Sequence, residues 1–586
     1  MLSPTNPTTT RKIWSLLTPA ERRSAVALLG LMIIGMLLET LGVGLVIPAL
    51  ALLTQSDLAH SYPALQSLLQ ALGNPSQQTL VIGGMLLLVG VYLIKALFLA
   101  FLAWRQTRFS FGVQIQLSQR LFTVYLRQPY TFHLQRNSAQ LLRNVTGEVG
   151  TFTGAITSIQ TILTECLVLL GIATLLLLVE PLGVLIVGLL FGGAAWGFHH
   201  STSTHITRWG QVRLHHDGLR IQAVLQGLGG VKDVKLLGRE GDFLAQHSVH
   251  STQSARVGQF RATLQQLPRL WLELFAVAGM ALLVLSMLAQ ERDIASVVPT
   301  LGLFAVAAFR LMPSVNRVLG AVQTLRYSLA PINTLYEERK LAEPGPAVHN
   351  IDGTAFQHDI CLIDINYTYP NSAEPVLNSL SITIQKGESV GFIGPSGSGK
   401  STLVDVILGL LPPSAGQVVV DGQDIQQNLR HWQNQIGYVP QSIYLTDDTL
   451  RRNVAFGMPN EQIDDATIQR AIQAAQLDGF VASLPDGLET LVGERGIRLS
   501  GGQRQRIGIA RALYHDPAVL VLDEATSSLD TATESDVMQA ITTLQGTKTI
   551  IMVAHRLSTV KQCDRLYRVG QGRLTVEQSP SAMPHQ

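Results

Sequence analysis

Residues 388–409 read ESVGFIGPSGSGKSTLVDVILG, an apolar strand that runs into a glycine-rich loop and then into a helix. The segment Gly394–Ser401 matches the pattern G-x-x-x-x-G-K-[ST] in the strand–loop–helix context that this pattern requires. The glycines let backbone N–H groups wrap a phosphate, and the start of the helix adds partial positive charge. We expect Lys400 to reach the β- and γ-phosphates of ATP and Ser401 to bind Mg²⁺. The nucleotide-binding residues of this loop are predicted to be Gly394, Ser396, Gly397, Ser398, Gly399, Lys400, Ser401 and Thr402.

A pair of acids follows a second apolar strand. The stretch AVLVLDEATSSLD spans Ala518 to Asp530, and its four apolar residues lead directly into Asp523 and Glu524. Paired acids at a strand end can simply cap a helix. Behind a phosphate-binding loop they favour chemistry: Asp523 would hold Mg²⁺, and Glu524 would polarise the attacking water as a general base.

The pentapeptide LSGGQ, Leu499 to Gln503, identifies the family that this half of the chain resembles. Residues 356–586 resemble the nucleotide-binding domain of ABC transporters, in which this signature binds the γ-phosphate of ATP held by the opposite protomer. A hydroxyl and bare backbone at a helix start suit that role. The resemblance assigns it to Ser500, Gly501, Gly502 and Gln503.

The remaining family elements occur in the expected order along the chain. Tyr369 resembles the aromatic residue that stacks on adenine, with Tyr367 as the near alternative. Gln441 resembles the glutamine that links Mg²⁺ to the membrane domain. Asp530 resembles the aspartate that follows the acidic strand, and His555 the histidine that contacts the γ-phosphate. The resemblance therefore implies an ATP hydrolase with Glu524, His555 and Gln441 as its catalytic residues.

The first half of the chain is apolar. Only 14% of the 586 residues are charged, where a soluble protein carries about 25%. A bilayer-spanning helix needs about 20 apolar residues, and six candidate spans are found at 24–53, 79–104, 154–179, 181–199, 264–289 and 297–317. We expect a polytopic α-helical membrane domain fused to an α/β P-loop domain. The predicted boundaries are an N-terminal segment at 1–23, a transmembrane domain at 24–335, a linker at 336–355 and a nucleotide-binding domain at 356–586.

Basic residues set the orientation of the spans. The links at 105–152 and 200–262 are rich in Lys and Arg, and the link at 55–78 has neither. The long links and both termini are therefore predicted to be cytoplasmic, in a bacterial inner membrane. No cleavable signal is expected. The three cysteines are far apart and suggest neither a disulfide nor a metal site. The net charge of +2 indicates no particular class of partner, and no nucleic-acid partner is expected.

One chain supplies six spans and one ATPase, which by the family resemblance is half of a transporter. A homodimer is implied, with the architecture of type IV exporters. That architecture places two coupling helices near Tyr130–Phe132 and Lys232–Gly238. In the outer link, Leu65, Leu68, Leu69 and Leu72 recur with helical periodicity, which predicts a short amphipathic helix that packs on its own domain or contacts lipid tails.

Basic residues inside the predicted spans bear on the cargo. Arg310 and Arg317 lie about two turns apart on one helix face, and Lys95 and Arg269 lie at a similar depth near the inner leaflet. Arginine inside a bilayer is costly, about 2.5–3.5 kcal/mol on insertion scales. Either acids such as Glu39, Glu165 and Glu273 neutralise these cations, or the cations bind an anionic cargo. We expect Arg310 and Arg317 to lack an acidic partner, because no acid lies within a turn of either.

Segments of the membrane half resemble a narrower type. ETLGVGLVIPALALL in the first span and GGVKDVKLLGRE in the second long link look like the PglK type of lipid-linked oligosaccharide flippase. That resemblance implies ATP-driven flipping of a polyprenyl-pyrophosphate-linked oligosaccharide from the inner leaflet, as in protein glycosylation. Its pyrophosphate would be bound by Lys95, Arg269, Arg310 and Arg317. The alternatives are export of another lipid, a glycerophospholipid or lipid A, or of peptides or drugs.

Overall fold

The computed structural model describes residues 7–45, 77–179, 181–289, 294–341, 354–370, 372–525, 531–554 and 556–577. The chain forms two compact units: Met1–Gln128 with Gln135–Glu343, and Pro129–Leu134 with Pro344–Gln586. The predicted outer amphipathic helix, Asp530 and His555 lie outside the described residues. So does the side chain of Arg310, whose backbone is helical.

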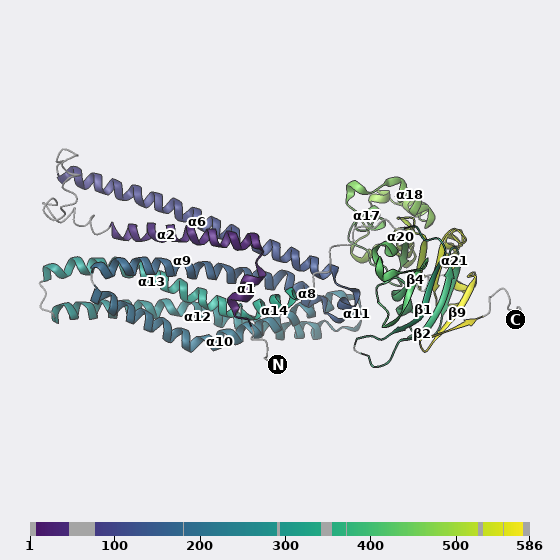
Figure 1. Ribbon diagram of the computed structural model, residues 1–586, viewed down its shortest axis with the longest axis horizontal. Coiled ribbons are helices and arrows are strands. Elements are labelled where there is room, and N and C mark those ends of the chain that lie inside the picture. Colours follow the sequence, from purple (N-terminus) through teal and green to yellow (C-terminus); the bar gives the residue numbers. More distant parts are fainter. Residues whose placement is uncertain are drawn as a thin grey trace. The chain divides into compact units, whose positions relative to one another are not determined.

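The first unit is helical throughout its described part. Its long helices run lengthwise beside one another (Figure 1). Helices α10, α12 and α13 contact one another, α9 packs on α10 and α13, and α2 packs on α6 and α9. Its helices are α1 (Thr9–Leu16), α2 (Pro19–Gly44), α6 (Gln77–Arg127), α8 (Ser138–Arg143), α9 (Val149–Val179), α10 (Pro181–Gly229), α11 (Val231–Leu237), α12 (Glu240–Ala289), α13 (Ile294–Tyr327) and α14 (Leu329–Arg339). Helix α7 (Tyr130–Gln135) lies almost entirely in the segment Pro129–Leu134 of the second unit.

Three helices are much longer than a membrane is thick. Helices α6, α10 and α12 contain 51, 49 and 50 residues, which at about 1.5 Å per residue gives roughly 75 Å each. The hydrocarbon core of a bilayer is about 30 Å thick. Each of these helices therefore continues well beyond its apolar segment into the basic links.

Apolar side chains face outward where the spans are predicted. Among the described residues, three helical segments are long and apolar enough to cross a membrane: Pro19–Gly44, Val81–Arg127 and Ser138–Leu178. On α6, Leu86, Leu87 and Val89 are 65–68% exposed. A continuous apolar surface of this kind is unfavourable in water and favourable against lipid. The remaining three predicted spans stay a prediction.

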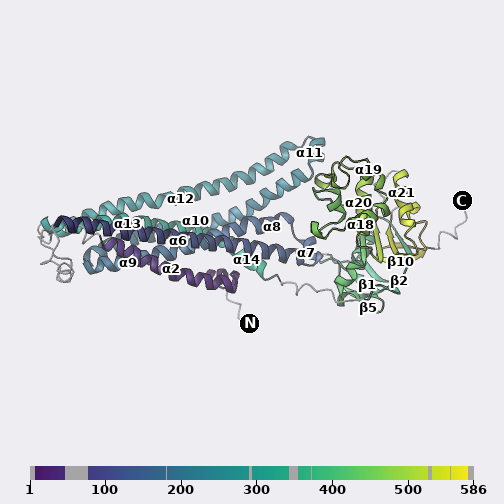
Figure 2. The ribbon, with the colours of Figure 1, turned by 90° about the horizontal axis from the view of Figure 1, so that it is seen from above.

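Short helices occupy both positions where coupling helices are expected. Helix α7 begins directly after Pro129, and α11 connects α10 to α12 (Figure 2). Helix α11 ends at Gly238, whose φ of 63° is the left-handed conformation that glycine adopts most easily at a helix C-terminus. The segment Pro129–Leu134 groups with the second unit rather than with the helices on either side of it.

A buried ionic cluster joins three helical segments of the first unit. A π-helix, Asn144–Glu148, lies between α8 and α9, and the side chain of Glu148 at its end is 1% exposed. Glu148 pairs with Arg213 of α10 at 2.9 Å and with Arg143 of α8 at 3.5 Å. Two cations thus share one buried carboxylate, and Arg213 also lies 3.8 Å from Asp217.

The second unit contains two sheets. The six-stranded sheet has the order β10-β9-β3-β8-β7-β6, and the four-stranded antiparallel sheet has the order β2-β1-β4-β5. The strands are β1 (Asp359–Tyr367), β2 (Leu377–Gln385), β3 (Ser389–Ile393), β4 (Ala415–Val420), β5 (Gln423–Asp424), β6 (Ile436–Val439), β7 (Val519–Asp523), β8 (Thr549–Val553), β9 (Arg565–Gly570) and β10 (Arg573–Glu577).

The six-stranded sheet is parallel from β9 to β6, and β3, β7 and β8 are buried along their whole length. Strands buried on both faces are typical of parallel sheets covered by helices. The helices of this unit are α15 (Lys400–Ile407), α16 (Leu429–Asn434), α17 (Leu450–Val454), α18 (Asp465–Ala474), α19 (Asp478–Ser483), α20 (Gly501–Leu513), α21 (Thr531–Thr542) and α22 (Leu557–Val560). The predicted fold class, a helical membrane domain joined to an α/β P-loop domain, is confirmed.

Candidate nucleotide site and membrane ion pairs

The glycine-rich loop connects β3 to α15, as its sequence predicts. A side chain at Gly394 would meet the carbonyl oxygen of Val569 at 2.2 Å, and Gly399 has a φ of 101°. Both positions therefore require glycine, one for space and one for backbone conformation. The loop then leads into α15, whose first residues are Lys400 and Ser401.

Lys400 lies folded against this loop. Its Nζ donates to the carbonyl oxygens of Gly394 and Pro395 at 2.9 and 3.0 Å, and the residue is 5% exposed. Burial lowers the pKa of its ammonium group, and the charges of Glu524 and Asp523 act in the opposite direction. The two acids and the lysine therefore belong to one electrostatic site.

The two acids occupy the end of β7, beside β8. Asp523 is the last residue of the strand and is 6% exposed. Glu524 has a φ of 50°, and its N–H donates to the carbonyl oxygen of Val553 at 2.9 Å. Its Oε2 accepts a hydrogen bond of 2.6 Å from Nε2 of Gln441. The structure thus places Gln441, Asp523 and Glu524 together at the edge of the sheet next to Lys400.

The two candidate aromatic residues differ in burial. Tyr367 is 3% exposed and belongs to the core, whereas Tyr369 is half-buried and meets the Tyr367 ring edge-on at 5.0 Å. The hydroxyl of Tyr369 lies 3.1 Å from Oγ1 of Thr402. Tyr369 is therefore the better placed of the two to offer a ring face to a ligand at the loop.

The signature pentapeptide forms the start of α20. Ser500 is the N-cap residue: its Oγ accepts from the Gln503 N–H, and its own N–H donates to Oε1 of Gln503, a reciprocal capping box. Gly501 and Gly502 are the first residues of the helix, where backbone N–H groups have no partner within the helix. This end of α20 suits an anion such as a phosphate.

An acid that the sequence analysis missed lies on α15. Burial, and to a smaller degree the charge of Asp523, raises the pKa of Asp405 to about 6. The pKa of the Tyr130 hydroxyl is also raised, chiefly by burial and to a smaller degree by the charge of Asp405. Tyr130 belongs to the segment Pro129–Leu134. The available signal was an acid inside the otherwise apolar run LVDVILG, five residues after Lys400.

These residues fit Mg²⁺ and a nucleotide triphosphate. The loop offers bare backbone where any side chain at Gly394 would collide, and Ser401, Gln441 and Asp523 would supply oxygen ligands of the kind that Mg²⁺ prefers. Held by these residues, the ion would supply positive charge against the phosphates.

Two of the basic residues predicted to bind the cargo, Lys95 and Arg269, each form an ion pair with an acid named in the sequence analysis. Lys95 lies 2.8 Å from Glu39, and its ammonium also sits 4.7 Å from the ring centroid of Tyr92. Arg269 pairs with Glu273 of its own helix at 2.9 Å, in a largely exposed position.

The expectation that Arg317 lacks an acidic partner is wrong. Its Nε and Nη2 donate to the two carboxylate oxygens of Glu165 at 2.5 and 3.1 Å. The partner comes from α9, which packs against α13, and a search within one turn of the same helix cannot find it. The Arg317 side chain nevertheless remains 43% exposed.

Comparisons with known proteins agree with this geometry. A family model described as ABC transporter matches residues 377–527. A protein named ATP-dependent lipid A-core flippase from Cupriavidus metallidurans is 30% identical over 500 residues, covering 84% of this chain and 83% of the relative. The chain belongs to the ABC transporter family.

Further ABC transporters support the exporter type. Proteins with the same printed name from Chromobacterium violaceum and Nitrosococcus oceani are 30% and 31% identical, over 92% and 83% of this chain and 92% and 82% of the relatives. A solved bacterial Atm1-family ABC exporter with ATP bound shares the fold, with a TM-score of 0.76, 24% identity and 94% coverage of each chain. This ABC exporter is therefore a membrane protein that binds ATP and couples its hydrolysis to transport.

Proposed function

We propose that this exporter moves a phosphate-bearing lipid from the inner to the outer leaflet of a bacterial inner membrane, as a homodimer. The relatives named lipid A-core flippase are about 30% identical to this chain over most of their length, which supports a lipid cargo. They favour the lipid A alternative over the polyprenyl-pyrophosphate-linked oligosaccharide. The oligosaccharide is kept as the second candidate because of the membrane segments that resemble that flippase type.

The exposed guanidinium of Arg317 is the main observation in favour of a phosphate-bearing cargo. Glu165 engages only Nε and Nη2, and a guanidinium has five N–H donors. Glu165 therefore fixes the orientation of Arg317 while the other edge of the group stays accessible. Arginine binds phosphate through charge-assisted, often bidentate, hydrogen bonds. Arg310 lies seven residues earlier on α13, so the two residues lie on the same helix face.

The paired cations play a smaller part in this proposal. Lys95 is 14% exposed and held between Glu39 and Tyr92, so an anionic ligand would have to displace a carboxylate to reach it. Arg269 is 72% exposed, and exposed pairs contribute little energy, so it is free to turn toward a headgroup.

ATP hydrolysis drives the proposed transfer. Lys400 would bind the β- and γ-phosphates, and Ser401, Gln441 and Asp523 would hold Mg²⁺. Glu524 would take a proton from the attacking water, with His555 and Asp530 completing the site. Ser500, Gly501, Gly502 and Gln503 would close the site on the nucleotide of the second protomer, with Tyr369 against adenine.

The experiment is flipping in proteoliposomes with ATPase activity measured in the same sample. Three fluorescent probes are compared: a lipid A analogue, a pyrophosphate-linked polyprenyl saccharide and phosphatidylcholine. We expect Arg317→Ala to lower flipping of the preferred phosphate-bearing probe by about tenfold or more, equivalent to about 1.4 kcal/mol. Basal ATP hydrolysis should persist.

Two variants complete the design. Arg317→Lys should recover flipping only partly, because it restores charge without the planar fork. Arg105→Ala removes an exposed arginine of α6 and should leave flipping unchanged. Normal flipping by Arg317→Ala, or equal transport of all three probes, would overturn the proposal and return the cargo to peptides or drugs.

A further inference from the structure

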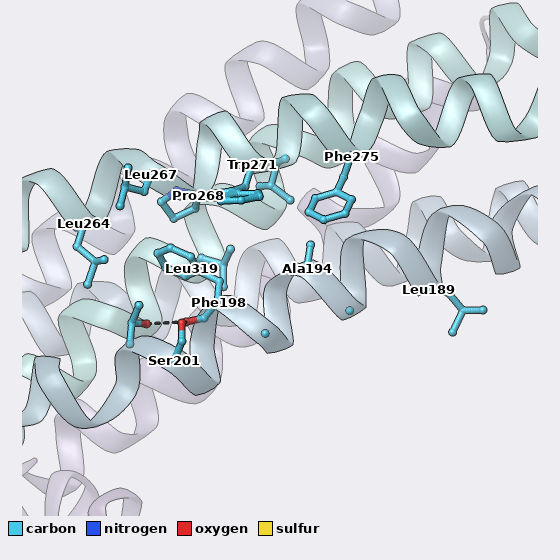
Figure 3. Close-up of a pocket in the computed structure, with 14 residues that line it drawn as sticks. Leu189, Ala194, Phe198, Ser201, Leu264, Leu267, Pro268, Trp271, Phe275 and Leu319 are labelled. Carbon is cyan, nitrogen blue, oxygen red and sulfur yellow. Dashed lines mark hydrogen bonds between the residues drawn. The ribbon is translucent and has the colours of Figure 1, made fainter.

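A crevice in the membrane half is lined by three helices. It has a volume of about 650 Å³ and lies between α10 and α12, with Leu319 of α13 at its base. Figure 3 shows Ala194 and Phe198 of α10 facing Pro268, Trp271 and Phe275 of α12 across this space. Its lining is apolar apart from the hydroxyls of Ser201 and Thr202, both of which donate to the carbonyl oxygen of Phe198.

The sequence explains why a crevice forms here. Gly193, Gly197 and Ser201 recur every four residues on α10 and line the space, and a side chain at either glycine would meet nothing within 4 Å. On α12, Pro268 lies inside the helix, where proline removes one backbone hydrogen bond and bends the axis. Small residues on one wall and a proline in the other leave the space between the helices unfilled.

The crevice lies at the depth of the inner leaflet in the predicted topology. Its residues on α10 run from Leu189 to Thr202, toward the cytoplasmic end of the predicted span at 181–199, and those on α12 begin at Leu264, where the predicted span starts. Large apolar side chains at its mouth are exposed, with Leu189 at 70% and Trp271 at 54%. A lipid in the inner leaflet could therefore insert a chain from the side.

The arginines near the crevice differ in their partners. Arg213, Arg269 and Arg317 are paired with Glu148, Glu273 and Glu165, so their charges are largely offset. Arg261 and Arg326 instead contact Thr324 and His199. Basic groups without a carboxylate against them attract ligands of the opposite sign.

Two of these arginines lie at the cytoplasmic end of the crevice. Arg326, two turns beyond Leu319 on α13, donates to Nε2 of His199 on α10 at 2.9 Å. Arg261, one turn before Leu264 on α12, donates to Thr324 of α13 at 3.4 Å, and its guanidinium stacks 4.2 Å from the Tyr327 ring centroid. Arg261 of α12 and Arg326 of α13 are thus each held in place by a neighbouring helix at this end of the crevice.

We propose that this crevice binds one hydrocarbon chain of an anionic lipid from the inner leaflet, with the phosphate of the headgroup at Arg261 and Arg326. The proposal rests on the lipid cargo proposed above and adds a place where the chain of that cargo enters. The apolar lining binds the hydrocarbon chain whatever the headgroup, and the two arginines favour lipids with a negatively charged headgroup.

Photolabelling of the full-length protein in phosphatidylcholine nanodiscs tests this site. The probes are phosphatidic acid and phosphatidylcholine with the same diazirine-bearing acyl chain, and the labelled peptides are mapped by mass spectrometry. We expect labelling at 189–202 and 264–275, stronger for phosphatidic acid. Gly193→Leu and Gly197→Leu fill the crevice and should lower this labelling about tenfold, equivalent to about 1.4 kcal/mol.

Gly192→Leu is the matched control, because it adds the same side chain to the neighbouring residue, which does not line the crevice. It should leave labelling unchanged. Arg326→Gln should bring the labelling by the two probes toward equality while the labelled peptides stay the same. Equal loss in Gly192→Leu and Gly193→Leu, or labelling confined to other helices, would overturn the proposal. So would a crosslink between this crevice and a second copy of the chain in place of lipid.

The two proposals fail in different ways. Labelling at the crevice without flipping of any phosphate-bearing lipid would leave the site in place and overturn the proposed function. Flipping without labelling at the crevice would leave the function in place and overturn the site.

Discussion

Gln441 donates its side-chain amide to Glu524 at 2.6 Å, which joins two residues 83 positions apart in the chain. Gln441 follows β6 and Glu524 follows β7, and these strands are parallel neighbours in the sheet. A movement of the loop that carries Gln441 therefore changes the surroundings of the carboxylate that is proposed to activate water.

Glu524→Gln should abolish turnover while ATP still binds. An amide at this position can still accept the hydrogen bond from Gln441, so the local geometry is kept, but it cannot take a proton from water. We expect ATP hydrolysis to fall by about 10² or more, with nucleotide affinity measured by equilibrium binding nearly unchanged. Glu461→Gln, at an exposed surface acid, serves as the control. Normal hydrolysis by Glu524→Gln would remove Glu524 from the role of base.

Gln441→Glu should move the pH dependence of ATP hydrolysis. It places a second carboxylate against Glu524, and two neighbouring carboxylates raise the pKa of one of them. A proton shared by the two carboxylates would then persist to higher pH, so the acidic limb of the pH–rate profile of the variant should move to higher pH. The measurement is ATPase rate between pH 5 and 9. A profile that falls at all pH values without shifting would show that the two side chains separate before hydrolysis.

Asp405→Asn should stabilise the nucleotide-binding unit at alkaline pH only. The pKa of Asp405 is raised to about 6 by burial and by Asp523, so the folded state favours its neutral form. In the wild type, the contribution of Asp405 to the free energy of unfolding is fully present below its unfolded-state pKa of about 4. It is lost as the pH rises through the folded-state pKa of about 6. We expect the variant to gain about 1–2 kcal/mol at pH 8, allowing for solvent screening, and nothing at pH 4. Calorimetry of the full chain at the two pH values measures the difference, and an equal effect at both would contradict it.

Glu148→Ala should destabilise the helical unit. It leaves Arg213 and Arg143 partly buried without their shared carboxylate, and loss of one partner of a buried pair costs about 3–5 kcal/mol. Glu240→Ala removes an acid of a surface pair with Lys235 and should change stability very little, because exposed ion pairs contribute little. Thermal unfolding in the same detergent compares the two. Similar melting temperatures would mean that the arginines find other partners.

The pair Lys95–Glu39 can be separated from cargo binding by a double substitution. If the pair serves packing between α2 and α6, Lys95→Met and Glu39→Gln should each lower the yield of folded protein, and the combination should recover it. If Lys95 also binds cargo, the double variant should fold normally and still flip lipid poorly. Flipping equal to wild type in the double variant would assign Lys95 to structure alone.

Patterns that are local in the sequence predicted their structures well. The strand, loop and helix around Gly394 and Lys400, and the helix start at Ser500, are set by neighbouring residues, so their sequences determine them. Ion pairing in the membrane half depends on which helices pack together. Glu39 and Glu165 both lie in the predicted spans. Glu39 pairs with Lys95 because α2 packs on α6, and Glu165 pairs with Arg317 because α9 packs on α13. Similarly, the raised pKa of Asp405 depends on burial behind β7, which no spacing along the chain reveals.

The π-helix at Asn144–Glu148 has a consequence for insertions and deletions. A π-turn holds one residue more than an α-turn, and each residue of an α-helix turns the chain by about 100°. Removing one of residues 145–147 would close the wide turn into an α-turn, and Arg143 and Glu148 would then be four residues apart, a spacing that also puts both on one helix face. Inserting a residue, with the wide turn already filled, would rotate α8 by about a quarter turn relative to α9. Arg143 would then face away from Glu148, and Asn144 from Tyr125, to which it now donates. The π-turn thus makes the cytoplasmic end of the bundle tolerant of a deletion and intolerant of an insertion.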